Sequence, residues 1–254
     1  MTDTPKTVLI TGANRGLGRA TALHLGRAGV DVVVAYRANA EQAEEVVAEI
    51  AATGGRALAV QLDTTDVGAF PAFAEALPGA LRAAFGREQL DALVNNAGSG
   101  VHAPFAQTSE AQLDAMLDVH VKGPYLLTQA LLGLLTDGGD VLFVSTGLTR
   151  FSIPGYSAYA SAKGAVEVLA RYLAQELGDR QIAVNAIAPG ATGTDFGGGA
   201  MREDEETRAA LGGMIAMGRI GEPEDIAGAI TALLTSDSHW VTGQRIEASG
   251  GMRL

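Results

Sequence analysis

The sequence predicts one α/β domain, in which helices cover both faces of a doubly wound parallel sheet. Short apolar segments of strand length alternate with longer segments of helical spacing from one end of the chain to the other. Glycines cluster at the ends of the apolar segments, as tight strand-to-helix turns require. The chain has 254 residues, more than a typical domain of about 150, but it contains no linker or low-complexity tract. We therefore assign residues 1–254 to a single domain.

Strands are expected where apolar residues run almost without interruption. These segments are 7–10, 30–35, 57–62, 92–94, 141–144, 183–187 and 245–247. Helices are expected where apolar or alanine positions recur three and four residues apart, at 17–28, 40–53, 68–84, 112–135, 158–177 and 224–235. The first strands are apolar on both faces, so the sheet must be covered on both sides. Right-handed crossovers then make its strands parallel.

Composition excludes several classes of protein. Hydrophobic residues make up 47% and charged residues 19%, as in a folded globular chain, and the absence of cysteine excludes disulfides and thiolate sites. The net charge of −11 repels phosphate backbones, so we expect no nucleic-acid partner. Because the chain has neither a signal-peptide core nor an apolar run of about 18 residues, we expect a cytoplasmic protein without membrane contact. The four histidines form no ligand cluster, and no metal is expected.

The stretch 192–219 interrupts the alternation of strands and helices. It carries a glycine triplet at 197–199, a glycine pair at 212–213 and an acidic cluster at 203–206. Glycine hinges around a short helical segment are typical of a substrate lid, and ligands of such sheets bind at the carboxyl ends of the strands, where this stretch begins. We expect a lid, with a plain surface excursion as the alternative.

The turn between the first strand and the first helix, residues 11–18, reads Thr-Gly-Ala-Asn-Arg-Gly-Leu-Gly. Gly12 permits the tight turn, Gly16 lets the backbone approach a pyrophosphate, and Gly18 lets the helix pack closely on the strand. The start of the helix supplies oriented N–H donors for an anion. The turn therefore predicts a dinucleotide site in a sheet of Rossmann type.

Tyr159 and Lys163 lie four residues apart near the start of a long expected helix. This spacing places the phenol and the ammonium on one face, where the lysine charge can lower the tyrosine pKa from about 10 toward neutrality. The pair can then act as a general acid or base. The same spacing is common on surface helices, so the pair alone does not identify a site.

Together these motifs resemble those of the short-chain dehydrogenases/reductases. Five motifs occur in the order of that family: Thr11-Gly12-x-x-x-Gly16-x-Gly18, Asn95-Asn96-Ala97-Gly98, Tyr159-x-x-x-Lys163, Pro189-Gly190 and Thr242-Gly243-Gln244. The resemblance implies that residues 95–98 steady the sheet and border the adenine ribose. It also implies that Asp63 and Thr64 flank the adenine and that residues 189–194 lie along the nicotinamide.

The glycine turn and the resemblance together give a set of expected cofactor-binding residues. They are Gly12, Asn14, Arg15, Gly16, Leu17, Gly18, Tyr36, Arg37, Asp63, Thr64, Asn95, Ala97, Gly98, Tyr159, Lys163, Pro189, Gly190, Thr192 and Thr194.

Two positions depart from the usual catalytic residues of the family. The usual serine, 13 residues before the tyrosine, is Thr146 here, with Ser145 beside it as the rival. Neighbouring strand residues point to opposite faces, so only one of the two can face the substrate, and we expect Thr146. The usual asparagine, which helps to hold a water linking the lysine to solvent, is His120. His120 either positions that water, exchanges protons near pH 6.5, or is only packed in its helix.

The end of the second expected strand bears on the identity of the cofactor. Tyr36 stands where NAD-preferring relatives tend to carry an acid, and Arg37 follows it. An acid would accept from a ribose 2′-hydroxyl, whereas an arginine pairs with a 2′-phosphate, which Arg15 can approach from the other side. Two cations at these places on an acidic chain favour NADP(H) over NAD.

These features predict an NADP(H)-dependent carbonyl reductase or alcohol dehydrogenase with a small-molecule carbonyl or alcohol substrate. Tyr159 would act as the acid or base, Thr146 would bind the carbonyl oxygen, Lys163 would hold the nicotinamide ribose, and His120 would support the proton relay. A 3-oxoacyl-carrier-protein reductase is one alternative, which the charge of −11 disfavours. A non-catalytic NADP-binding sensor protein is the other.

Two further expectations concern the surroundings of the site. Apolar residues expected to line the substrate pocket are Phe151, Ile153, Tyr156, Phe196, Met201 and Met214. The resemblance implies a homotetramer built on the helices at 112–135 and 158–177 and on the C-terminal segment.

Overall fold

The computed structural model describes residues 5–196, 199–236 and 240–254 of the chain. The strands within these residues are β1 (Thr7–Thr11), β2 (Asp31–Tyr36), β3 (Ala57–Gln61), β4 (Leu90–Asn95), β5 (Leu135–Val144), β6 (Ala183–Pro189) and β7 (Arg245–Ala248). The α-helices are α1 (Gly16–Arg27), α2 (Ala40–Ala52), α3 (Phe70–Phe85), α4 (Glu110–Leu117), α5 (Gly123–Leu131), α6 (Ser157–Glu176), α7 (Ala200–Glu203), α8 (Glu205–Gly212) and α9 (Pro223–Thr235).

The strands form one parallel sheet in the order β3-β2-β1-β4-β5-β6-β7. The chain starts in the middle of the sheet, winds outward to β3, then returns past β1 and continues to β7. The switch of direction lies between β1 and β4, and a ligand of such a sheet binds at the carboxyl ends of the strands at that point. The predicted doubly wound sheet is confirmed.

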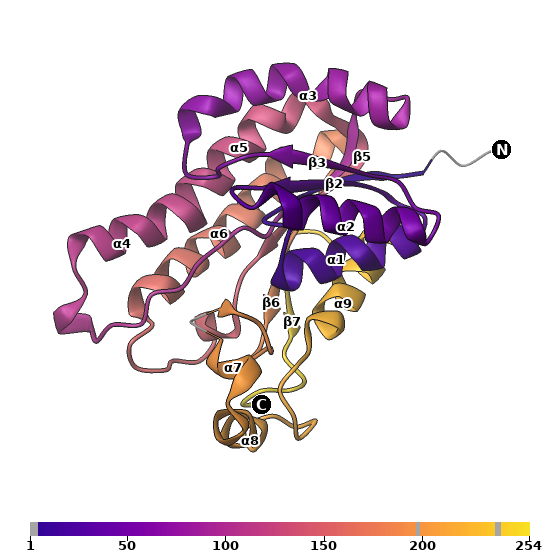
Figure 1. Cartoon of the computed structure of the whole chain (residues 1–254). Helices are drawn as coiled ribbons and strands as arrows, with labels where there is room; N and C mark the ends of the chain where they lie inside the picture. The colour runs from indigo at the N-terminus through magenta and orange to yellow at the C-terminus, as the bar shows by residue number, and fades with distance from the viewer. Residues whose placement is uncertain (1–4, 197–198, 237–239) are drawn as a thin grey trace.

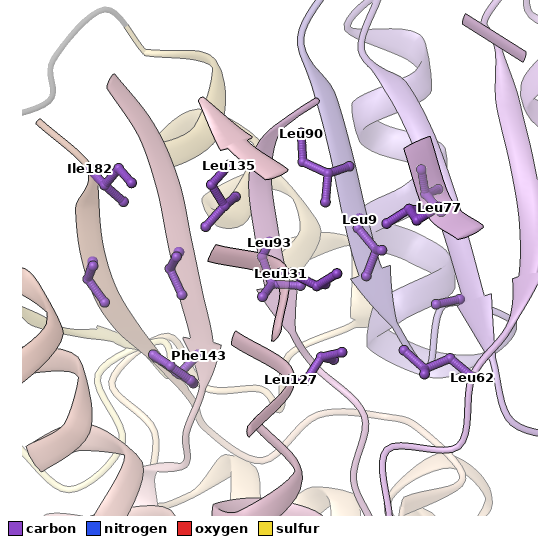
Figure 2. Packing of buried hydrophobic residues seen from close by; sticks show 14 of the residues in the cluster. Leu9, Leu62, Leu77, Leu90, Leu93, Leu127, Leu131, Leu135, Phe143 and Ile182 are labelled. Atoms are coloured by element: carbon purple, nitrogen blue, oxygen red, sulfur yellow. The ribbon is translucent and has the colours of Figure 1, made fainter. Parts of the chain in front are cut away.

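Helices cover both faces of the sheet (Figure 1), because successive residues of each strand point to opposite sides. Leu9 packs in the core beneath α3, α5 and α6, whereas Val8 and Ile10 pack in the core beneath α1, α2 and α9. Figure 2 shows the first of these cores, in which Leu127 and Leu131 of α5 lie against the strands. All of these side chains are fully buried.

The expected helix at 112–135 is wrong in its extent. It is divided into α4, a π-helical turn at Asp118–Lys122 and α5, and β5 begins already at Leu135. Leu135 pairs with Leu90 ahead of a register shift, and the extra residues before Asp140 bulge out at Gly138, where φ is +76°. Because apolar spacing continues through all of these segments, it could not locate the boundaries.

The stretch 192–219 forms α7 and α8, which lie beside the C-terminus at one end of the molecule (Figure 1). Residues 197 and 198 of the expected lid lie outside the described residues. The stretch is tied to the C-terminal segment by a bridge between Ile215 and Met252, and both of these residues are buried together with Ile220. Among the described residues, no helix has the length and apolar character to cross a membrane.

Candidate active site

The glycine turn after β1 has the backbone shape that the sequence predicts. Gly12 and Gly16 have positive φ angles of 65° and 55°, which disfavour any side chain. A Cβ on Gly18 would collide with the carbonyl oxygen of Gly12 and lie 2.6 Å from Nδ2 of Asn96. No side chain within the described residues caps α1, and its first turn contains no acidic residue, so this end of the helix can bind an anion. The turn therefore fits a pyrophosphate.

The residues after β4 hold this turn in place. The hydroxyl of Thr11 accepts from the backbone N–H groups of Asn96 and Ala97 at 3.0 and 2.9 Å. The Asn96 amide donates to the Thr11 carbonyl at 2.8 Å, and the Asn95 amide donates to the Thr128 hydroxyl at 3.1 Å. A Cβ on Gly12 would lie only 3.0 Å from Cα of Ala97. This segment thus ties the glycine turn to the sheet.

Arg15 and Arg37 are exposed beside the glycine turn. Asn14 links their two loops, because its amide donates to the Ala38 carbonyl at 3.4 Å, while Tyr36 is half-buried at the end of β2. Neither arginine forms an ion pair with any residue that the structure describes. Two arginines without an ion-pair partner at this edge can receive a phosphate.

The other expected cofactor contacts surround the turn. Thr192 and Thr194 follow β6 and are buried, as is Thr64 after β3. The methyl group of Thr194 lies 4.0 Å from the point that a Cβ on Gly16 would occupy. Although partial burial opposes it, hydrogen bonds from Thr65 and the charge of Arg37 hold the pKa of Asp63 below its ordinary value. Leu17 lies in the first turn of α1, and Pro189 and Gly190 lie at the end of β6.

Tyr159 and Lys163 lie on one face of α6, and both are buried. The Lys163 ammonium donates to the Val144 carbonyl at 2.6 Å and lies 5.9 Å from the centre of the Tyr159 ring. The structure thus brings the end of β5 together with the predicted acid and its lysine.

The expected lowering of the Tyr159 pKa is wrong for this state of the protein. Burial raises the pKa of Tyr159 well above its ordinary value, and a hydrogen bond with the Thr146 side chain only partly opposes that rise. Burial also lowers the pKa of Lys163 to about 7. Both groups lose hydration in their charged forms, which the sequence spacing could not reveal. The phenol is therefore protonated at neutral pH, the form in which it can donate a proton.

Thr146 and Ser145 point in different directions at the end of β5. The Thr146 side chain shares a hydrogen bond with Tyr159, whereas the Ser145 hydroxyl donates to Oε1 of Glu167 at 2.5 Å. The structure therefore places Thr146, the expected residue, beside the phenol.

His120 lies in the π-helical turn between α4 and α5 and is fully buried. Its Nε2 donates to the Ser99 carbonyl at 2.6 Å, and its Nδ1 has no hydrogen-bond partner among the described residues. Burial and the charge of Lys163 lower the pKa of His120 to about 3, so the imidazole is neutral at physiological pH. Gly98 makes room for the ring, since a Cβ there would lie 2.7 Å from Cε1.

The ring of Phe196 packs against Tyr159. The Phe196 ring lies 5.3 Å from the Tyr159 ring, and Cζ of Phe196 lies 2.6 Å from the point that a Cβ on Gly100 would occupy. Gly100 therefore provides the notch that receives Phe196. Sequence reasoning did not single out Gly100, because a notch depends on which side chain lies opposite.

The expected pocket residues fall into two groups. Tyr156 and Phe196 pack with Tyr159, and Tyr156 and Ile153 also line a cavity of about 500 Å³. The cavity is completed by His102, Pro104, Phe105, Leu148, Ser152, Pro154, Gly155, Ser157 and Ala160. Phe151, Met201 and Met214 instead pack against Ile215, Ile220 and Met252, in a cluster apart from this cavity.

Comparisons with known proteins agree with this geometry. A family model described as "Enoyl-(Acyl carrier protein) reductase" matches residues 12–253. The structure of "Promiscuous Reductase LugOII", which "Catalyzes Keto-reduction at C1 during Lugdunomycin Biosynthesis", is 39% identical, with a TM-score of 0.93 and coverage of 99% of each chain. The "angucycline C-6 ketoreductase LanV with bound NADP" is 38% identical, with a TM-score of 0.91, and the match covers 98% of this chain and 95% of that one. The "Hydroxynaphthalene reductase-like protein Arp2" of Metarhizium brunneum is 36% identical over 257 residues, which cover 97% of this chain and 94% of the relative.

Proposed function

Because the chain belongs to the short-chain dehydrogenase/reductase family, we propose that it reduces a ketone of a small molecule with NADPH. The observation that carries this proposal is the convergence of Thr146 and Lys163 on Tyr159, beside a glycine turn that fits a dinucleotide. Burial keeps the phenol protonated at neutral pH, and a protonated phenol is the acid that carbonyl reduction needs.

Each residue of the site has a role in this reaction. NADPH, when bound, supplies the hydride that reduces the carbonyl carbon. Thr146 and Tyr159 bind the carbonyl oxygen, and Tyr159 gives it a proton. Lys163 binds the nicotinamide ribose and, when protonated, makes the phenol a stronger acid. His120 is a neutral acceptor through Nδ1, which suits a residue that positions a water rather than one that exchanges protons.

Charge supports NADPH over NADH. Arg15 and Arg37 are exposed and form no ion pair within the described part of the chain. They lie on the two loops that the hydrogen bond from Asn14 to Ala38 links. The guanidinium of an arginine can pair with both oxygens of a 2′-phosphate. A ribose 2′-hydroxyl is instead bound by a carboxylate, and neither Tyr36 nor Arg37 carries one. The bound NADP in LanV is in keeping with this choice.

Apolar surroundings support a polycyclic aromatic ketone as the substrate. LanV is described as a ketoreductase of an angucycline, and Arp2 as similar to a hydroxynaphthalene reductase. Here Tyr156 packs against Tyr159 on one side and lines the cavity of about 500 Å³ on the other. Phe105 and Leu148 also line this cavity. Such a cavity has the size and apolar lining of a small-molecule site. Phe196, from the expected lid, packs against Tyr159 and would border the bound ketone there.

Two alternatives are weaker. An acidic carrier protein needs basic docking residues, but the chain has a net charge of −11. The stretches 130–133 and 174–176, from the two long expected helices, read Ala-Leu-Leu-Gly and Ala-Gln-Glu and contain no basic residue. A cofactor sensor without activity would not need Tyr159 and Lys163 to meet.

The exposed apolar side chains of Tyr125, Val168 and Tyr172 on α5 and α6 support the expected homotetramer. Light scattering, which measures the mass of the assembly in solution, tests it.

The decisive experiment follows the oxidation of NADPH and of NADH with 1-tetralone, cyclohexanone and acetoacetyl-carrier protein. We expect 1-tetralone with NADPH to give the highest kcat/KM. Faster reduction of the carrier-linked substrate would favour the first alternative. NADPH binding by calorimetry without turnover of any ketone would favour the sensor.

A further inference from the structure

A partly buried ionic network joins α6 and β7 behind the site. Glu167 lies on the same face of α6 as Tyr159 and Lys163, because the three residues are spaced four apart. Its Oε1 accepts hydrogen bonds from the hydroxyls of Ser145 and Thr149 at 2.5 and 2.7 Å, and from Nε of Arg245 at 2.8 Å. The side chains of Arg245 and Glu167 are only 21% and 11% exposed.

Arg245, at the start of β7, extends this network to the backbone of Thr146. Its Nη2 donates to the Thr146 carbonyl at 3.1 Å, and the Thr149 hydroxyl, whose single proton is shared between this oxygen and Glu167, lies 2.9 Å from the same carbonyl. Its Nη1 pairs with Oε2 of Glu247 at 2.5 Å. One guanidinium thus uses all three of its nitrogens, which lysine in its place could not do.

Consecutive residues at the end of β5 are therefore held one by one. Lys163 binds the carbonyl of Val144, Glu167 binds the hydroxyl of Ser145, and Arg245 binds the carbonyl of Thr146. Charged hydrogen bonds in a poorly hydrated region are strong and leave costly unpaired groups when one member is lost. Removing a member should therefore let the strand end relax.

We propose that Glu167 and Arg245 are positioning residues, which fix the end of β5 so that the Thr146 side chain meets Tyr159. The inference rests on the proposed function, in which the Thr146 hydroxyl binds the carbonyl oxygen. A displacement of about 1 Å in such a group can lower a rate by up to about a hundredfold.

The test measures kcat, the ketone KM and the NADPH Kd of Arg245→Met and of Glu167→Gln, which keeps the shape of the side chain. We expect kcat to fall at least about tenfold in each variant, with the Kd for NADPH changed by less than about twofold. If the network acts through Thr146, Arg245→Met should cost less than about twofold in a Thr146→Ala background.

Arg180→Met is the matched control. Arg180 also donates to two carbonyls, those of Leu132 and Leu135 at 2.9 and 2.6 Å, and pairs with Asp137 at 2.8 Å, but it lies at the opposite end of β5. It should lower Tm while leaving kcat within about twofold of the wild type.

The outcomes separate the two proposals. If the wild type reduces ketones but Arg245→Met and Glu167→Gln keep their kcat, or Arg180→Met loses as much, the positioning role is overturned and the reductase stands. If the wild type reduces no carbonyl, the proposed function fails, and crystal structures of the wild type and Glu167→Gln decide the inference. A displaced Thr146 side chain in the variant supports it, and superimposable positions overturn it.

Discussion

The imidazole of His120 meets the ring of Tyr159 edge-on, with the ring centroids 5.2 Å apart and the planes at 82°. Both groups are buried, and burial favours the neutral form of each. Tyr159, the proposed acid, therefore has an uncharged neighbour at the position where the family usually has an asparagine. Lys163, with a pKa of about 7, is the member of the group whose charge changes near neutrality.

Replacing Tyr159 by phenylalanine should abolish turnover. The change removes the proton donor and the hydrogen bond with Thr146 but keeps the ring, so kcat should fall at least about a hundredfold while the NADPH Kd stays within a few fold. Steady-state kinetics and fluorescence titration with NADPH measure the two quantities. Tyr172→Phe on the exposed side of the same helix is the control. Retention of more than about a tenth of kcat in Tyr159→Phe would contradict the assignment.

Thr146→Ala and Ser145→Ala should differ sharply. Thr146 shares its hydrogen bond with Tyr159, so its loss should lower kcat by about a hundredfold. Ser145 is one of several donors to Glu167, so Ser145→Ala should cost less than about fivefold. The kcat values of the two variants, measured side by side, decide between the hydroxyls. The opposite order would identify Ser145 as the reacting one.

The sheet and the glycine turn were predictable because they depend on local patterns. An apolar run or a glycine with positive φ, such as Gly12, determines the backbone conformation of the few residues around it. Both features are found at the positions that the sequence predicts. The direction of Ser145 and Thr146 followed from strand alternation. What failed depends on tertiary surroundings. The pKa of Tyr159 is raised by burial that no spacing records, and the π-helical turn around His120 interrupts a periodicity that continues on both sides of it.

The network of Glu167 and Arg245 escaped the sequence analysis for a related reason. The two residues are 78 positions apart, and neither belongs to a motif. Only the adjacency of β6 and β7 brings Arg245 to α6 and to the end of β5.

Arg37→Asp should reverse the cofactor preference. The arginine attracts a 2′-phosphate and an aspartate repels it, so we expect kcat/KM for NADPH to fall at least about tenfold while that for NADH rises. Both cofactors are compared before and after the change. Arg27→Asp makes the same change of charge at the far end of α1, where the arginine is exposed, and should leave the preference unchanged. A wild type that prefers NADH would contradict the cofactor assignment.

Gly100→Ala should act through Phe196. The new methyl group would lie 2.6 Å from Cζ of the ring, so the ring must move from its place beside Tyr159, and we expect the ketone KM to rise about fivefold. In a Phe196→Ala background the same change should have little effect, because the clash is gone. Gly79→Ala in α3, which meets nothing within 4 Å, is the control. Equal effects of Gly100→Ala in both backgrounds would show that Phe196 is not involved.

His120 should not exchange a proton during turnover. With a pKa of about 3, the folded protein keeps the imidazole neutral at neutral pH, so His120→Asn should preserve the shape of the kcat profile between pH 6 and 9. A limb near pH 7 should survive in the variant, since it would belong to Lys163. Loss of that limb in His120→Asn would instead show proton exchange by the imidazole. An unchanged rate in His120→Ala would show that the residue only packs.

Stability gives an independent measure of the same pKa. The folded-state pKa of His120 lies below the ordinary value of 6.5, so between pH 6.5 and 3 the unfolded chain binds the proton that the folded protein excludes. The free energy of unfolding must therefore fall as the pH falls through this window, by up to about 1.4 kcal/mol per pH unit. Urea unfolding at pH 6.5 and pH 5 should show a steeper loss of stability in the wild type than in His120→Asn, because only the wild type carries the imidazole. Carboxylates contribute equally to both proteins, so the difference in slope belongs to His120. Parallel slopes would mean that the imidazole has the same pKa in the folded and the unfolded protein, so that it titrates near neutrality and proton exchange returns to the mechanism.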